Sequence, residues 1–267
     1  MQKLTFLLLT LFISSSLLAQ NEDNEECRAL YNQEKFDDSY QCYAKDNDRI
    51  FSVYMAAYLA EFLEYKKSFK KHYKHLLSDD FDSPEQYYYA ANLHPKNSKK
   101  HFKLLKKGLK KYESDTLLLQ SQIEYFINVK DYDQALESCK NYATQNTNLY
   151  IILRSADILR LQEKYQMAIP LYEKALLKDE KNYNAHYWIG MIYHDQASAL
   201  LLLSGGVETA EESEKLEKEA ISLLKKALPH IEFAYKKNSK STDLKSALLT
   251  CYKRLGMELK YNMLRDL

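Results

Sequence analysis

Glycine and proline are scarce in this sequence of 267 residues. It holds five Gly and four Pro, about 3% together, where an average protein has about 12%. A sheet-rich fold with many tight turns needs more of both, because glycine supplies left-handed backbone and proline fixes the first turn dihedral. The composition therefore predicts an all-α protein.

An excess of charge of one sign is also missing. The chain carries 38 Lys and Arg against 37 Asp and Glu. Domains that bind nucleic acid usually have a basic excess, so we expect no nucleic-acid partner.

Catalytic motifs are absent as well. The sequence contains no His-Glu-x-x-His, no Gly-x-Ser-x-Gly and no glycine-rich phosphate loop. His194-Asp195 is the one adjacent pair that invites an acid–base interpretation, and His72 and His75 share a helix face where they either pack between helices or ligate a metal with a third residue. We predict neither an enzyme nor a bound cofactor or metal.

Apolar runs long enough to span a membrane are missing, and the N-terminus has a shorter one. Lys3 gives a positive start, residues 4–18 are mostly apolar, and Ala19 precedes a polar stretch. This is the anatomy of a secretory signal peptide, so we expect residues 1–19 to be removed and the rest to be exported to the periplasm of a Gram-negative bacterium or beyond the cell. The alternative is an uncleaved N-terminal anchor.

Four cysteines follow the signal, and no two have the spacing of a zinc or thioredoxin-like motif. Cys27 and Cys42 lie 15 residues apart in the first expected helical hairpin. An oxidising compartment allows them to form a disulfide, and the alternative is a pair of buried thiols. Cys139 and Cys251 are expected in the core.

A pattern with a period near 34 residues runs through the chain. Its clearest copy is Tyr165-x-x-Ala168-Ile169-x-x-Tyr172-x-x-Ala175, and related segments begin 33, 67 and 100 residues earlier. These segments predict second helices, and their partner first helices are expected to begin near Arg49, Asp82, Thr116, Leu149 and Tyr183. Short polar residues stand at most of these starts, where they can cap a helix.

The pattern resembles the tetratricopeptide repeat (TPR) family, in which 34-residue helix-turn-helix units stack into a solenoid. Ala156 and Gly190 match the family's small residue in the first helix, and Ala135, Ala168 and Ala175 match its small residues in the second. Tyr89 and Ile123 stand where small residues are usual. The resemblance implies an all-α solenoid, a right-handed superhelix of antiparallel helix pairs, as a single domain over residues 20–267 with its strongest copies in 116–198.

The last repeat is interrupted by about 25 residues, because Ala227-x-x-x-Ile231-x-x-Ala234 comes too late in the period. We expect a helical insertion over about 199–222, in which the first helix is prolonged to Leu203, a Ser204-Gly205-Gly206 turn follows, and a charged helix covers Glu208 to Leu228.

The resemblance also implies a concave side, lined by first helices, that holds a segment of a partner protein. Its groove-facing positions carry a mixture of aromatic, charged and amide side chains that suits a peptide. Carried over copy by copy, they are Glu124, Asn128, Tyr150, Asp157, Arg160, Tyr187, Met191, His194 and Asp195. The alternative is that they are ordinary exposed or half-buried helix residues.

Charge is unevenly distributed along the chain. Residues 65–111 hold 13 Lys against four acids, whereas residues 208–219 hold six Glu against two Lys. Lysines recur at helical spacing opposite apolar residues in two second helices, which the resemblance places on one convex patch. That patch comprises Lys66, Lys67, Lys70, Lys71, Lys74, Lys99, Lys103, Lys106 and Lys110. It is either a solvated face or a surface for an acidic protein or anionic lipid headgroups.

These features favour an exported, non-catalytic scaffold of the TPR type that binds a partner protein or peptide in the cell envelope. The main alternative is an envelope protein that binds glycan or peptidoglycan fragments in a Tyr-rich groove, with Tyr150 and Tyr187 as contacts. An enzyme subunit and self-association through the insertion are further alternatives. The sequence does not set the partner or the oligomeric state.

Overall fold

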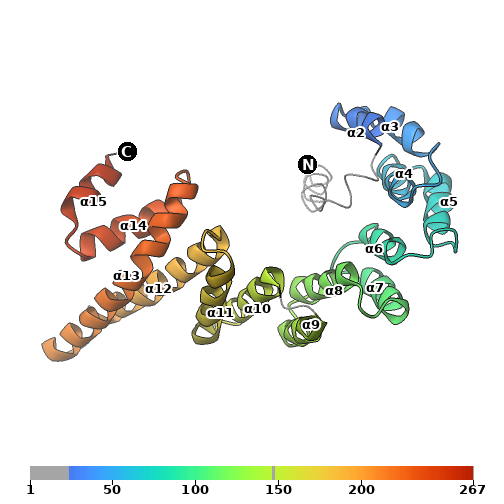
Figure 1. Ribbon diagram of the computed structural model, residues 1–267. Helices are drawn as coiled ribbons and strands as arrows, with labels where there is room; N and C mark the ends of the chain where they lie inside the picture. Colours follow the sequence, from blue (N-terminus) through green and yellow to red (C-terminus); the bar gives the residue numbers. More distant parts are fainter. Residues whose placement is uncertain (1–23, 146–147, 267) are drawn as a thin grey trace. The chain divides into compact units, whose positions relative to one another are not determined.

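The computed structural model describes residues 24–145 and 148–266, so the predicted signal peptide lies outside the described residues. Within these ranges the regular structure consists of helices alone, and Figure 1 shows them following one another in hairpins. The fold is all-α, as predicted. The helices are α2 (Glu25–Asn32), α3 (Phe36–Tyr43), α4 (Ile50–Phe62), α5 (Lys66–Leu76), α6 (Pro84–Asn92), α7 (Lys99–Lys111), α8 (Thr116–Asn128), α9 (Tyr132–Gln145), α10 (Leu149–Leu161), α11 (Tyr165–Lys178), α12 (Tyr183–Ser204), α13 (Ala210–Lys237), α14 (Thr242–Arg254) and α15 (Glu258–Arg265).

The chain divides into two units, residues 1–138 and 139–267, and the boundary falls inside α9. In the first unit α2 packs on α3, α4 on α5 and α6 on α7, and the first helices α4, α6 and α8 also contact one another in turn. In the second unit α10 packs on α11, α12 on α13 and α14 on α15, and first helices α12 and α14 are in contact. This is the neighbour-to-neighbour packing of a helical solenoid. A single domain over residues 20–267 stays a prediction.

Short polar side chains fix where the first helices begin. The side chains of Asp115, Asn148 and Asn182 accept hydrogen bonds from the backbone N–H groups of Leu118, Ile151 and Ala185, at 2.8, 3.1 and 3.1 Å. Each therefore satisfies an N–H that the helix itself leaves unpaired. The sequence pattern predicted the three starts at Thr116, Leu149 and Tyr183 correctly.

The start of α6 lies two residues later than the period gives. The helix begins at Pro84 and not near Asp82, because Ser83 forms the cap and its N–H donates to Oε1 of Gln86 at 3.3 Å. Proline suits the first helical position, where its missing N–H has no partner to lose. The shift places Ala91, which is fully buried, at the position of the small residue that the sequence alignment gave to Tyr89.

Five of the hairpins share one turn. A three-residue connection joins the first helix to the second, and its middle residue has a left-handed backbone. These residues are Glu34, Glu64, Lys130, Glu163 and Gly256, with φ between 59° and 70°. The residue after each donates its N–H to a carbonyl five positions earlier, as Lys164 does to Leu159 at 2.9 Å. This is the Schellman ending of a helix, which usually uses glycine, and only the last hairpin has it.

The interruption of the repeat corresponds to two long helices. α12 continues to Ser204, and α13 runs from Ala210 to Lys237. The expectation that the charged helix ends at Leu228 was wrong, because α13 passes through the exposed Pro229 without ending. A stripe of buried residues at spacings of four and three keeps one face of α13 packed on both sides of the proline: Ala220, Leu224, Ala227, Ile231 and Ala234. This burial outweighs the roughly 3 kcal/mol that an internal proline costs.

Gly190 sets the distance between α12 and α13. A Cβ atom at this position would lie 2.7 Å from Cγ1 of Ile231 and 3.1 Å from the Ile231 backbone nitrogen. Side chains in a packed interior have no room for such an approach. The close contact of the two helices therefore depends on glycine at position 190.

The cysteines lie in the packed parts of both units. Cys27 and Cys42 form a disulfide with an S–S distance of 2.06 Å, which joins α2 to α3. Next to it, the hydroxyl of the buried Ser39 donates to the Cys27 carbonyl at 2.9 Å. Cys139 and Cys251 are buried, and neither forms a disulfide.

Candidate functional site

The predicted groove residues lie on first helices of both units. Tyr150, Asp157 and Arg160 are on α10, and Tyr187, Met191, His194 and Asp195 are on α12. These two helices belong to the second unit, and Arg160 of α10 contacts Trp188 of α12. We call the exposed and half-buried side chains of α10, α12 and α14 the first-helix face of the second unit.

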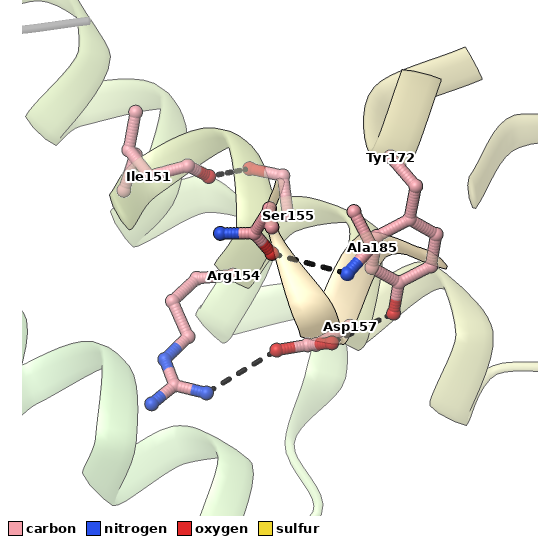
Figure 2. A network of polar contacts seen from close by, with 7 residues as sticks. Ile151, Arg154, Ser155, Asp157, Tyr172 and Ala185 are labelled. Carbon is pink, nitrogen blue, oxygen red and sulfur yellow. Dashed lines mark hydrogen bonds and ion pairs between the residues drawn. The ribbon is translucent and has the colours of Figure 1, made fainter. Parts of the chain in front are cut away.

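Asp157 is the centre of a polar network on this face (Figure 2). The Tyr172 hydroxyl, which comes from the second helix α11, donates to Oδ1 of Asp157 at 2.7 Å. Nη1 of Arg154 donates to Oδ2 at 3.2 Å, and 21% of the Asp157 side chain is exposed. Both carboxylate oxygens are therefore satisfied, and the carboxylate is held in one position between two helices.

Arg160 connects α10 to α12. Its guanidinium carbon lies 3.6 Å from the centroid of the Trp188 ring, which is a stacked cation–π geometry. Its Nε atom is buried and has no hydrogen-bond partner within the described part of the chain. The stacked guanidinium is thus fixed in orientation, and its buried Nε–H group lacks an acceptor among the described residues.

The α12 residues combine apolar packing with a polar edge. Tyr187 and Met191 are half-buried and pack on the core formed with α13 and α14. The Tyr187 ring meets Trp188 edge to face, with centroids 4.7 Å apart. Nδ1 of His194 lies 3.0 Å from Oδ1 of Asp195, whose side chain is 70% exposed, and the buried Nε2 of His194 has no partner among the described residues.

The two tyrosines of this cluster have perturbed acidities. Burial, and next the charge of Asp157, raises the pKa of the Tyr172 hydroxyl. Burial also raises the pKa of Tyr187, with further contributions from Asp243 on α14 and Asp195, while Arg160 lowers it. Charged groups on α10, α12 and α14 therefore all act on the Tyr187 hydroxyl.

Glu124 and Asn128 lie on α8 in the first unit. The Asn128 side chain donates to the Glu124 backbone carbonyl at 2.8 Å, so these two residues are joined by a bond within one turn of their own helix. Asn128 is exposed and Glu124 half-buried.

First helices of the first unit carry a cluster of aromatic side chains. The rings of Tyr54 on α4 and Tyr89 on α6 stack with centroids 4.8 Å apart and an interplanar angle of 22°. Phe51 and Tyr58 extend the cluster along α4, and Tyr88 extends it along α6. Burial, and next the neighbouring Tyr88, raises the pKa of Tyr54.

All nine lysines of the predicted basic patch are exposed, on the second helices α5 and α7. Lys100, Lys107 and Lys111 of α7 are exposed as well. Lys111 forms an ion pair with Asp82, whereas Lys100 and Lys107 lie over the rings of Tyr73 and Tyr87 at 5.3 and 5.7 Å. No carboxylate of the described chain forms an ion pair with the nine predicted lysines.

The described residues provide neither a metal site nor a membrane-spanning helix. His72 is 3% exposed and meets the Tyr40 ring, and His75 instead pairs with Asp80 at 3.5 Å, so the two histidines have separate partners. Across residues 24–145 and 148–266, no cluster of three or more His, Cys, Asp or Glu side chains could hold a metal ion. In those ranges no helix is both apolar and long enough to cross a bilayer.

Comparison with known proteins decides the fold family by structure alone. No protein-family model matches the sequence, and no curated protein matches it either. The C-terminal part of a TPR repeat-containing protein from Cytophaga hutchinsonii is 13% identical with a TM-score of 0.50, and the alignment covers 91% of this chain and 98% of that one. The fold is TPR-like.

Two other solved structures are similar at lower scores. Yeast Tom70 is 14% identical with a TM-score of 0.46, and the alignment covers 87% of this chain and 54% of Tom70. An IFIT1 mutant solved with m7Gppp-AAAA is 17% identical with a TM-score of 0.47, covering 89% of this chain and 57% of that one. The TPR-like chain thus spans about half the length of each of these two proteins.

Three residues of the site were missed by sequence reasoning: Arg154, Tyr172 and Trp188. Arg154 stands three positions before Asp157, a spacing that brings side chains together on a helix, and this signal was available. Tyr172 and Trp188 were assigned to the repeat pattern as packing residues. Their polar and cation–π contacts depend on how neighbouring helices meet, which the spacing within one helix does not show.

Proposed function

We propose that this TPR-like protein is an exported, non-catalytic scaffold that binds an extended segment of a partner protein on the first-helix face of its second unit. The observation that carries the proposal is a cluster of fixed side chains on this face. Tyr172 holds the Asp157 carboxylate, and the rings of Trp188 and Tyr187 meet beside the stacked Arg160 guanidinium. A preorganised mixture of aromatic and charged side chains is typical of binding hot spots.

The chemistry of the cluster suits a peptide. A peptide backbone presents N–H groups to the Asp195 carboxylate, whose side chain is exposed at the edge of this cluster. The half-buried Tyr187 and Met191 offer an apolar surface on the same face. Catalysis has no support here, because His194 and Asp195 have no nucleophile or third group arranged with them among the described contacts.

Export and location in the cell envelope rest on the N-terminal sequence, where Lys3, an apolar run and Ala19 are in the order of a signal peptide. A disulfide between Cys27 and Cys42 suits an oxidising compartment. The balanced charge of the chain gives no basis for a nucleic-acid partner, so we expect none, although the IFIT1 mutant of lower structural similarity was solved with m7Gppp-AAAA.

Affinity purification of the mature chain from its own envelope tests the proposal. The site variant combines Arg160→Ala, Tyr187→Ala and Asp195→Ala. A matched control changes three exposed residues of the second helix α11: Glu173→Ala, Lys174→Ala and Leu177→Ala. Thermal unfolding of both variants checks that each is folded. A protein captured by the parent and the control and lost by the site variant supports the proposal; equal capture by all three contradicts it.

Glycan binding is the second candidate, and the aromatic cluster of the first unit favours it. Stacked tyrosines such as Tyr54 and Tyr89 offer ring faces and hydroxyl groups of the kind that sugars contact. Isothermal titration with peptidoglycan fragments, repeated with Tyr54→Ala and with Tyr150→Ala and Tyr187→Ala, tests this candidate. Saturable binding that any of these changes removes would favour it over a protein partner.

A further inference from the structure

Two oppositely charged surfaces of this chain match each other. The first, the lysine face, consists of the exposed lysines of α5 and α7. The second, the acidic hairpin, is the tip where α12 turns into α13, covering residues 202–219. It carries Glu208, Glu211, Glu212, Glu214, Glu217 and Glu219, all exposed, together with Leu202 and Leu203.

Neither surface is neutralised within its own unit. Glu214 pairs with Lys218 at 2.6 Å, and no other glutamate of the acidic hairpin has an ion pair in the described chain. On the lysine face Lys111 alone has such a partner. Many like charges held close together repel one another, so both surfaces gain free energy when an opposite charge approaches.

The two surfaces also have similar lengths. The helix α7 has 13 residues and extends about 20 Å, and the acidic part of α13, residues 210–219, extends about 15 Å at 1.5 Å per residue. Lys99, Lys103, Lys106 and Lys110 recur at spacings of four and three and so form one stripe along α7.

We propose that the acidic hairpin of one copy binds the lysine face of a second copy. Leu202 and Leu203 are 81% and 57% exposed at the tip of the hairpin, and such large exposed apolar side chains are typical of a contact surface. The contact joins two different surfaces, so each copy has one of each kind to offer, and the copies assemble into a closed ring or an open chain.

An anionic membrane is a less suitable occupant of the lysine face. Proteins that bind membrane surfaces combine basic residues with apolar side chains that enter the bilayer. Within residues 65–111 the one large hydrophobic side chain that is exposed is Tyr65, at 39%. The exposed leucines lie beside the glutamates instead, and anionic lipid would repel those.

Sedimentation velocity of the mature full chain tests the proposal at low and high salt. We expect the weight-average mass to rise at least twofold with concentration at low ionic strength, and to return to one chain at about 0.5 M salt, where the screening length is a few Å. A lysine variant (Lys99→Gln, Lys103→Gln, Lys106→Gln) and a glutamate variant (Glu211→Gln, Glu212→Gln, Glu217→Gln) are each expected to stay monomeric.

Mixing the two variants gives the sharper result. The lysine variant keeps its acidic hairpin, and the glutamate variant keeps its lysine face. One contact can therefore form between the two variants, and we expect a dimer that does not grow further. A control variant with Lys236→Gln, Lys240→Gln and Lys253→Gln, all exposed elsewhere, should assemble like the parent. A parent that stays monomeric at low salt, or a mixture that stays monomeric while the parent assembles, overturns the proposal.

A vesicle assay tests whether an anionic membrane, and not a second copy, binds the lysine face. Vesicles with and without anionic lipid are mixed with the parent and with the lysine variant. Binding of a monomeric parent to anionic vesicles that the lysine variant lacks would overturn the proposal and assign the lysine face to a membrane. This outcome leaves the proposed peptide site unaffected, because Arg160 and Tyr187 are unchanged in every variant used here.

Discussion

The hydroxyl group of Tyr172 donates a hydrogen bond to Oδ1 of Asp157 across the hairpin of α10 and α11. The bond joins the second helix, which carries packing residues of the repeat, to a carboxylate on the first-helix face. Tyr172 is fully buried in the hairpin, so its position is set by packing. The geometry of the proposed site therefore depends on the core of its own repeat.

Replacing Tyr172 with Phe tests this dependence. The ring stays, and Asp157 loses one of its two donors, which leaves a half-buried carboxylate less well satisfied. We expect the free energy of unfolding to fall by about 2 kcal/mol, as for a buried hydrogen bond to a charged group. Urea unfolding measures it, and the exposed Tyr65→Phe, whose hydroxyl bonds Asp37 at the surface, is the matched control. A loss no larger than that of the control would show that the bond contributes little.

Replacing Gly190 with Ala tests the contact of α12 with α13. The new methyl group would meet Ile231 at a distance that packed atoms do not adopt, so the helices must move apart. Overpacking of this kind costs about 2 kcal/mol. Gly205→Ala serves as control, since its nearest neighbour would lie at 3.6 Å. Thermal unfolding in which both variants match the parent would mean that the close packing is not required.

The shared hairpin turn gives a pair of opposite effects. Glu163 has φ 59°, a backbone conformation that costs a residue with a side chain about 1 kcal/mol. Glu163→Gly should therefore raise the free energy of unfolding by a few tenths of a kcal/mol up to about 1 kcal/mol. Gly256 has φ 70°, so Gly256→Ala should destabilise the chain by about 1 kcal/mol. Chemical unfolding of both variants measures the two signs. If both substitutions shift stability in the same direction, the left-handed turn is not the cause.

Stability should fall as the solution becomes acidic. Burial lowers the pKa of His230 and of His94 to about 4, and that of His72 and His101 below the ordinary value of 6.5. His186 adds to the effect on His230, since their Nδ1 atoms are 2.9 Å apart. Nε2 of His186 faces the Glu180 carbonyl and must carry a proton, so in the neutral pair the Nδ1–H of His230 donates to His186.

The sign of the pH effect follows from proton binding. Between about pH 6.5 and pH 4 the unfolded chain binds more protons than the folded one, so the free energy of unfolding decreases as pH falls through this window. Urea midpoints at about pH 7.5 and pH 5.5 keep the carboxylates ionised and measure the histidines. We expect a lower midpoint at the acidic pH and a smaller difference for His230→Gln. A midpoint that rises with acidity contradicts this assignment.

The sequence predicted those parts of the fold that depend on local signals. Asp115, Asn148 and Asn182 cap helices where the period placed them, and the fold class follows from that period. The start of α6 lies two residues after the position that the period gives, because Ser83 caps the helix and Pro84 opens it. The continuity of α13 was missed because a stripe of buried residues overrides the local preference of Pro229.

The sequence predicted which helices carry the candidate site, but it did not predict the contacts that the site residues make. Resemblance to the repeat selected Asp157, Arg160 and Tyr187, which do lie on neighbouring first helices. Their partners come from other helices, and a pattern within one helix carries no information on which atoms of the next helix lie opposite. The aromatic cluster of α4 and α6 escaped notice for the same reason, since its rings meet across two helices.

Site-specific photocrosslinking tests whether the first-helix face of the second unit binds a partner protein. A benzoylphenylalanine is placed at position 187 on the first-helix face or at position 177 on α11, where Leu177 is 88% exposed, and cells that produce the full chain are irradiated. The account predicts a crosslinked partner protein from position 187 and none from position 177. Crosslinks from position 177 without any from position 187 would contradict it.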